Sequence, residues 1–175
     1  DGMDEPQARS VERLAAKADF LFMPIYAEKA AQIVITANEK GVKLPLLGGD
    51  GLDGILNYLT DENAKLVEGL IFLTPFISTD SDPKIQDFTK TYTNKYGQAP
   101  DQFAADGYDA VYLAKLALEK AGIKSPAELD NAALIKAMTE IELDGLTGKM
   151  TFDASGEPQK GAKVAKIDGG VYVAQ

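Results

Sequence analysis

The chain has 175 residues, of which 45% are hydrophobic, so it is long enough to form one domain with a real core or parts of two. It contains no histidine and no cysteine, which excludes catalysis by histidine or by a thiolate, and zinc sites built from these residues. A net charge of -9 disfavours nucleic acid and anionic lipid as partners, because both are negatively charged. A cationic or zwitterionic ligand fits better.

The beginning of the sequence, residues 1–17, is interpreted as a tail followed by the end of a helix at 11–16. The tail is acidic and polar, and the helical end leads into the first apolar run. No run reaches the length of a transmembrane helix, and no signal peptide begins the sequence. We therefore expect a soluble, mature or trimmed chain without direct membrane insertion.

A strand, a helix and a second strand are predicted next. Residues 19–25 form a nearly unbroken apolar run, which is typical of a parallel strand buried on both faces. Helical spacing follows up to Gly41, and a second apolar run occupies 44–47. Ligands of open parallel sheets bind beyond the carboxyl ends of the strands, and Tyr26 and Asp50 each follow one of these strands. Both residues are therefore candidate ligand contacts on one rim.

Asp50 also has an explanation that needs no ligand. A short helix is expected at 52–59, and an aspartate before a helix commonly accepts hydrogen bonds from its first N–H groups. The pattern alone leaves both explanations open. Asp53 is interpreted as a surface charge that complements the helix dipole. The segment 48–51, GGDG, lacks the spacing of a phosphate loop and places a carboxylate where phosphate would bind.

A third apolar strand is expected at 69–73, and Pro75 ends it because proline cannot donate to the ladder. The three strands are each joined through a helical crossover, so we expect them to be parallel in one sheet. Residues 78–83 have an Asp-x-Asp spacing but lack the glycine of a calcium loop. They are interpreted as a solvated loop.

Three helices follow without a strand between them, at 83–96, within 99–122 and at 131–139. The first carries an aromatic stripe that is interpreted as core. Such helices need a sheet to cover, and the surrounding sequence does not supply one. The last part of the chain is predicted to hold a short strand at 149–152 and a hairpin around 168–170.

Six segments of the sequence carry a resemblance to a known family. They are DFLFMPIY, GVKLPLLGGDG, EGLIFLTPF, the F-x3-Y-x3-YG pattern that starts at Phe88, GYDAVY and GLTGKMTFDASGEP. In this order they resemble the extracytoplasmic solute-binding proteins of ABC importers, of the type that binds branched-chain amino acids. The resemblance implies an α/β fold of the periplasmic-binding-protein-like type I, with doubly wound parallel sheet lobes, and a partial chain that lacks the N-terminal half.

The resemblance also divides the chain between two lobes. Residues 18–75 belong to the second lobe, and 76–158 form a helical segment of the first lobe with a short strand. Residues 159–175 are the final strands, which return to the second lobe. The sheet of the first lobe then lies in the absent half, which implies that the helices expose apolar surface or associate with another copy of the chain.

Three residues take binding roles from the resemblance. Tyr26 matches a tyrosine after the second-lobe strand, Asp50 matches the acidic residue that receives the ligand's α-ammonium group, and Phe103 matches an aromatic residue of the side-chain pocket. The resemblance implies a receptor that delivers an amino acid, branched-chain or otherwise apolar, to a membrane permease. It implies a periplasmic or cell-surface location and no enzymatic activity, catalytic residue, metal or cofactor.

Two other functions fit the same fold. The first is the ligand-sensing domain of a receptor or transcription regulator, which a membrane span or a DNA-binding helix-turn-helix in the full gene would identify. The second is an enzyme that uses Asp50 with Asp53 or Lys149. Acid–base catalysis would require such groups to be paired in a cleft with shifted pKa values.

Overall fold

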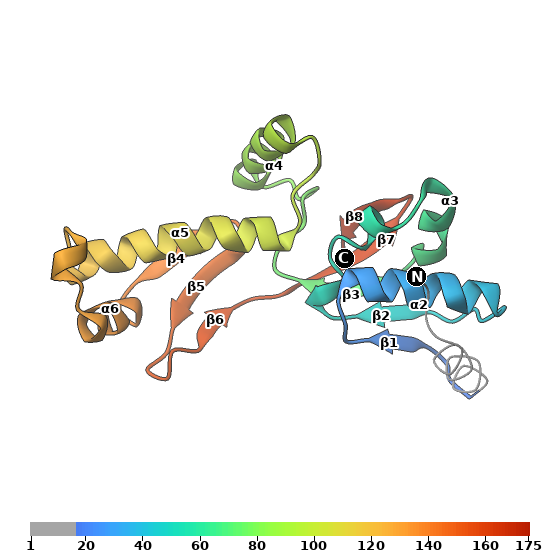
Figure 1. Cartoon of the computed structure of the whole chain (residues 1–175), viewed down its shortest axis with the longest axis horizontal. Helices are drawn as coiled ribbons and strands as arrows, with labels where there is room; N and C mark the ends of the chain where they lie inside the picture. Colours follow the sequence, from blue (N-terminus) through green and yellow to red (C-terminus); the bar gives the residue numbers. More distant parts are fainter. Residues whose placement is uncertain (1–16) are drawn as a thin grey trace. The chain divides into compact units, whose positions relative to one another are not determined.

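The computed structural model describes residues 17–175 (Figure 1), so the expected tail and the helix end at 11–16 lie outside the described residues. The chain forms two compact units. Of the described residues, unit 1 takes in 17–80 together with Lys163–Gln175, and unit 2 is Ser81–Ala162.

A five-stranded sheet forms the centre of unit 1, in the order β1-β2-β3-β7-β8. The first three strands are parallel, which confirms the expectation from the sequence. β7 pairs antiparallel with β3, and β8 pairs antiparallel with β7. The bounds are β1 (Leu21–Met23), β2 (Leu46–Gly48), β3 (Ile71–Thr74), β7 (Lys163–Asp168) and β8 (Val171–Ala174).

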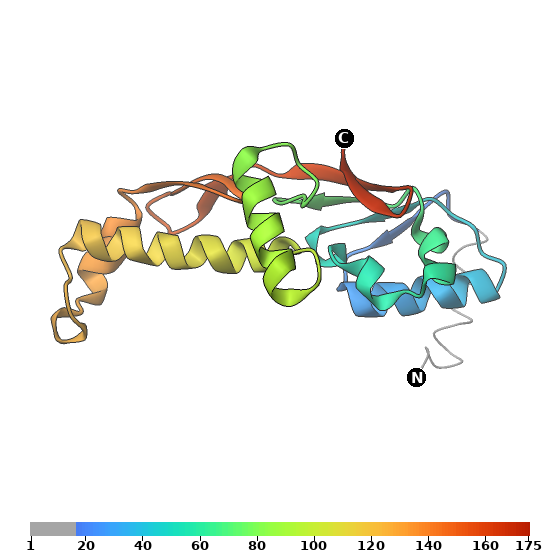
Figure 2. The same ribbon diagram turned by 90° about the horizontal axis from the view of Figure 1, so that it is seen from above.

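Helix α2 (Ala27–Glu39) connects β1 to β2 and covers one face of this sheet (Figure 2). Small residues such as Ala30 and Ala31 let it approach the strands closely, and both are buried. The helix ends before Gly41, which takes the left-handed conformation with φ 72° that favours glycine. The same core includes Met23, Phe72, Ala165 and Ile167 from the strands.

The segment after β2 corrects the expectation of a helix at 52–59. It forms two separate 3₁₀ turns, η1 (Asp50–Leu52) and η2 (Ile55–Tyr58). Gly54 between them takes φ 82°, and this left-handed residue interrupts the helical path. The chain then reaches β3 through α3 (Asp61–Ala64) and η3 (Lys65–Val67).

The second face of the sheet in unit 1 carries exposed apolar side chains. The strand register places Phe22 beside Leu47 and Leu47 beside Ile71, and a neighbouring row pairs Leu73 with Val164. Phe22 is 54% exposed and Leu73 is 51% exposed. The sequence predicted a first strand buried on both faces. This is wrong for the described residues, because none of them covers the face of the sheet that carries Phe22.

Unit 2 contains the three helices that the sequence predicts, α4 (Pro83–Tyr96), α5 (Gln102–Ala121) and α6 (Asn131–Met138). An aspartate side chain caps each of them, because its carboxylate accepts a hydrogen bond from a backbone N–H of the first turn. The caps are Asp82, Asp101 and Asp130. A 3₁₀ turn, η4 (Pro126–Glu128), lies between α5 and α6.

A three-stranded antiparallel sheet in unit 2 corrects the expectation that the chain supplies no sheet near these helices. Its strands are β4 (Glu142–Gly145), β5 (Gly148–Phe152) and β6 (Pro158–Lys160). The sequence predicted only β5. β4 contains two acidic residues and a glycine, and β6 begins with proline, so neither has the composition of a strand.

The aromatic stripe of α4 is not part of a core, contrary to the interpretation of the sequence. Ile85 is buried, but Phe88 and Tyr92 are half-buried and Tyr96 is 56% exposed. The rings contact one another along the helix, with centroids 5.7 Å apart for Phe88 and Tyr92. Phe88 also meets Tyr108 of α5 at 5.1 Å. These helices therefore expose apolar surface, which is one of the two outcomes expected if the sheet of the first lobe lies in the absent half.

Candidate functional site

Tyr26 and Asp50 lie just beyond the carboxyl ends of two neighbouring parallel strands. Tyr26 precedes α2 as its N-cap residue, and Asp50 begins η1. Met23 and Gly48, the last residues of β1 and β2, are partners in the strand register, so both candidates follow the same edge of the sheet. Both side chains are exposed, Tyr26 to 72%. This edge is where open parallel sheets bind ligands.

Gly51 brings the two chain segments into contact. A Cβ atom added to Gly51 would lie 2.8 Å from the carbonyl oxygen of Ile25 and 3.5 Å from Cα of Tyr26. The turn that begins with Asp50 therefore packs directly on the backbone that carries Tyr26.

Asp50 does not occupy the N-cap position of a helix. Gly49 holds the N-cap position of η1, and no side chain accepts a capping hydrogen bond there. Oδ1 of Asp50 instead accepts a hydrogen bond from the N–H of Gly51 at 3.0 Å. This local contact orients a carboxylate that stays exposed at the sheet edge.

The glycines of the segment 48–51 serve close packing rather than phosphate binding. A Cβ atom at Gly48 would lie 2.0 Å from Cδ1 of Leu52, a side chain with no exposed surface. A Cβ atom at Gly49, in contrast, would have no neighbour within 4 Å. Gly48 therefore makes room for a core residue below the turn.

Asp53 is buried, so its interpretation as a surface charge is wrong. It is 7% exposed, and its Oδ1 accepts a hydrogen bond from the N–H of Gly54 at 2.9 Å. The chain takes an extended conformation at Asp53, with φ -60° and ψ 138°, and does not continue as a helix. The side chain therefore lies inside the turn instead of on a solvated helix face.

Lys149, the third residue of the enzyme alternative, belongs to unit 2. Its Nζ forms an ion pair with Glu142 at 2.8 Å. The hydrogen bond to Glu142 raises the pKa of Lys149, which keeps the amine charged. A lysine held in its charged form is a poor general base.

Phe103 lies in the first turn of α5 in unit 2 and is 45% exposed. Asp101 fixes the start of this helix, because its Oδ1 accepts a hydrogen bond from the N–H of Ala104 at 2.9 Å. The side chain is therefore available for contacts on the surface of unit 2. Its place in a ligand pocket stays a prediction.

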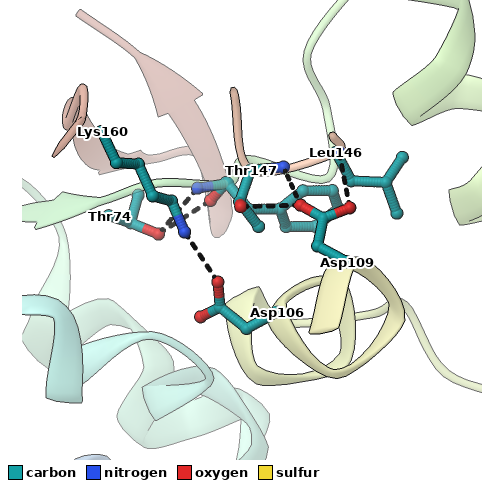
Figure 3. A network of polar contacts seen from close by, with 7 residues as sticks. Thr74, Asp106, Asp109, Leu146, Thr147 and Lys160 are labelled. Atoms are coloured by element: carbon teal, nitrogen blue, oxygen red, sulfur yellow. Dashed lines mark hydrogen bonds and ion pairs between the residues drawn. The ribbon is translucent and has the colours of Figure 1, made fainter. Parts of the chain in front are cut away.

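A buried carboxylate in unit 2 was missed by the sequence analysis (Figure 3). Oδ1 of Asp109 accepts a hydrogen bond from the N–H of Leu146 at 2.9 Å, and its Oδ2 accepts from the N–H and the hydroxyl of Thr147 at 2.8 and 2.7 Å. Asp109 is 3% exposed. A Cβ atom at Gly145 would lie 2.4 Å from this carboxylate. Asp109 thus holds the β4–β5 turn on α5, and the residues that it joins belong to two of the family motifs, GYDAVY and GLTGKMTFDASGEP.

A cavity of about 330 Å³ lies beside Asp109 in unit 2. Aromatic side chains from α4 and α5 line it, among them Phe88, Tyr108 and Tyr112. The ion pair of Lys84 with Asp144, at 2.9 Å, also lies there, and the hydrogen bond from Lys84 lowers the pKa of Asp144. A second cavity, of about 550 Å³, lies in unit 1 near the amino ends of β1 and β2. Neither cavity is lined by the three candidate site residues.

Comparison with known protein families shows to which family the chain belongs. Residues 6–171 match the family described as periplasmic binding protein. The chain belongs to the periplasmic binding protein family. The resemblance carried by the six sequence motifs is thereby confirmed. A search among curated proteins found no match.

Solved structures of substrate-binding proteins share the fold of the chain. A branched-chain amino acid transporter substrate-binding protein from Streptococcus pneumoniae, in complex with isoleucine, has 26% identity and a TM-score of 0.75 over 95% of this chain and 48% of that one. A leucine-binding protein from Thermotoga maritima has 24% identity and a TM-score of 0.78 over 99% and 48%. An ABC transporter solute-binding protein from R. palustris, in complex with benzoate, has 20% identity and a TM-score of 0.82 over 98% and 46%.

The chain spans about half the length of these solved structures. The α/β fold of this family, with a parallel sheet, is confirmed for the part that the chain covers. The relatives are components of transport systems rather than enzymes. Among residues 17–175 no helix is both long and apolar enough to cross a membrane, and no acidic cluster there has the arrangement of a metal site.

Proposed function

We propose that the chain is part of the receptor of an ABC importer and that the ligand is an amino acid with an apolar side chain, first of all a branched one. One observation carries the proposal. Tyr26 and Asp50 are exposed beyond the carboxyl ends of β1 and β2, on backbone segments that touch at Gly51. This arrangement places a carboxylate and a phenol ring at the edge where parallel sheets bind ligands.

The proposed role of Asp50 is to bind the α-ammonium group of the ligand. A hydrogen bond between a carboxylate and an ammonium group contributes about 1.5–3 kcal/mol when it is shielded from water. Tyr26 adds a hydroxyl group or the face of its ring, which attracts a cation. Phe103 keeps the role that the resemblance gives it, an apolar wall for the ligand side chain.

The ligands of the relatives leave two classes to distinguish. Two of the related structures are of proteins that bind leucine or isoleucine, and one holds benzoate. Benzoate has no ammonium group, so the carboxylate of Asp50 would repel it. The exposed aspartate at the sheet edge therefore favours an amino acid over an aromatic acid.

The membership in the family supports an extracytoplasmic location and a membrane permease as the partner. In the same proposal, residues 18–75 and 159–175 belong to one lobe of the receptor, and 76–158 belong to the other. The sensor domain of a receptor or regulator is the alternative, and a DNA-binding or membrane-spanning segment elsewhere in the gene would support it.

Calorimetric titration of the full-length product of the gene tests the proposal. Leucine, isoleucine, valine and benzoate are titrated into the wild type and into Asp50→Asn, which keeps the shape of the side chain and removes its charge. We expect amino acid affinity to fall about tenfold to a hundredfold, equivalent to about 1.4–2.8 kcal/mol, with little change in thermal stability.

Asp19→Asn is the matched control, because Asp19 is also an exposed aspartate. It precedes the amino end of β1, whereas the candidate site lies beyond the carboxyl end of this strand. It should bind amino acids as the wild type does. Binding of benzoate but not of amino acids would contradict the proposed ligand class, and unchanged affinity of Asp50→Asn would remove Asp50 from the site.

A further inference from the structure

We propose that Gly51 is a positioning residue that sets the spacing between Asp50 and Tyr26. The inference rests on the proposed function, because it assigns these two side chains to one ligand. Gly51 itself has no side chain to contact the ligand. Its contribution is the close approach of two backbone segments.

The approach at Gly51 is closer than any other residue type allows. The 2.8 Å between a Cβ atom at this position and the carbonyl oxygen of Ile25 is shorter than real Cβ contacts, and the carbonyl carbon of Ile25 would lie at 3.3 Å. Both are backbone atoms, so they cannot rotate away as a side chain would. A methyl group at position 51 must therefore separate the two segments.

Space rather than backbone conformation requires glycine here. The glycines with positive φ include Gly41 and Gly54 but not Gly51. Alanine at position 51 is therefore compatible with the local backbone, and its conflict is with the backbone carbonyl group of Ile25.

A displacement at Gly51 acts differently on the two candidate side chains. The carboxylate of Asp50 is bound to the N–H of Gly51, so it moves with the turn. Tyr26 is held by α2, because its carbonyl oxygen accepts a hydrogen bond from the N–H of Ala30, a residue with no exposed surface. Alanine at position 51 therefore shifts Asp50 relative to Tyr26, and binding sites tolerate only about 0.5 Å of such misplacement.

Two neighbouring glycines provide matched controls. Gly49→Ala adds the same methyl group where no atom lies within 4 Å, and the extended backbone there, with φ -92° and ψ -171°, suits alanine. Gly48→Ala instead collides with the buried side chain of Leu52. The first control should change neither stability nor binding. The second should lower the stability of the sheet core.

The test is a double-mutant cycle on the full-length product, with calorimetric titration of leucine. The variants are Gly51→Ala, Asp50→Asn, their combination and Gly49→Ala. We expect Gly51→Ala to weaken binding about tenfold and Gly49→Ala to stay within about twofold of the wild type. The combined variant should bind no more weakly than Asp50→Asn alone, because both changes disable the same contact.

Wild-type affinity in Gly51→Ala would overturn the inference, and so would losses that multiply in the combined variant. If the wild type binds leucine but the variants give either of these results, the inference on Gly51 is wrong and the proposed function stands. If the wild type binds no amino acid, the proposed function fails. Crystal structures of wild type and Gly51→Ala then decide the positioning claim, since an unchanged spacing between Cα of Asp50 and Cα of Tyr26 would overturn it.

If the Gly51→Ala variant does not fold, a measurement on the wild type tests the inference instead. In a crystal structure with leucine, Gly51 should keep its contact with the carbonyl group of Ile25 while Asp50 and Tyr26 both touch the ligand. A bound structure in which the turn has moved away from Ile25 would overturn the inference.

Discussion

Two aspartates, one in each unit, have opposite surroundings. Asp50 in unit 1 is exposed at a sheet edge, and the N–H of the next residue donates to it. Asp109 in unit 2 is 3% exposed and accepts hydrogen bonds from two N–H groups and a hydroxyl group. The exposed carboxylate is accessible to a ligand, whereas the buried one has its acceptors engaged by the protein itself.

Burial and the geometry of the hydrogen-bond donors distinguish a structural carboxylate from one that is accessible to a ligand. Asp109 holds a turn on a helix, so its loss should lower the stability of unit 2. Asp50 is exposed at the edge proposed to bind the ligand, so its loss should lower ligand affinity. Substitutions in unit 2 test the structural role of Asp109 and of the residues around it.

Asp109→Ala should have the largest effect on stability. It leaves the N–H groups of Leu146 and Thr147 buried without their acceptor, and we expect a loss of about 3 kcal/mol or more in the free energy of unfolding. Urea unfolding followed by circular dichroism measures it. Asp106→Ala is the control on the same helix, because its ion pair with Lys160 is partly exposed and contributes about 1 kcal/mol or less. Equal losses for the two variants would contradict the structural role of Asp109.

Gly145→Ala should have the next largest effect. The added Cβ atom would lie 2.4 Å from the carboxylate of Asp109, and we expect a loss of about 1–3 kcal/mol through overpacking. In the Asp109→Ala background the same change should cost clearly less, because the collision partner is gone. If the losses in the free energy of unfolding of the two single variants simply add in the double variant, the added methyl group does not collide with Asp109.

Asp144→Asn should have the smallest effect and a characteristic dependence on pH. Its hydrogen bond with Lys84 lowers the pKa of Asp144 below the ordinary 3.8, so the stabilisation is complete above that pH and is lost as pH falls through the folded-state pKa. The pair is exposed to solvent, which screens it. Thermal unfolding at neutral pH should separate wild type and variant slightly, and the two curves should converge in acid. A constant difference at all pH values would assign the effect to packing.

Elements with local signals were predictable from the sequence. α4 begins at Pro83 after the capping Asp82 and ends before Gly97, and these signals act over a single helical turn. The position of Asp50 after an apolar run was predictable in the same way, because strand ends set the edge of a parallel sheet.

Features that depend on distant partners could not be predicted. β4 and β6 exist because each pairs with β5, and their own composition does not favour strands. Asp109 sits in a helical pattern that gives no sign of burial, and its hydrogen-bond donors lie 37 and 38 residues further along the chain. The contact at Gly51 was hidden for the same reason, since it depends on how closely the turn approaches Ile25.

The order of the strands in unit 1 has a consequence for how the chain folds during synthesis. β3 pairs with β7, and Thr74 is the register partner of Lys163. In the sequence, the whole of unit 2 lies between these two strands. Unit 2 is continuous, so all of it is available before the last two strands of unit 1 leave the ribosome. The sheet that carries Asp50 and Tyr26 is therefore completed after unit 2 has been made, with β3 as a temporary open edge until β7 is made.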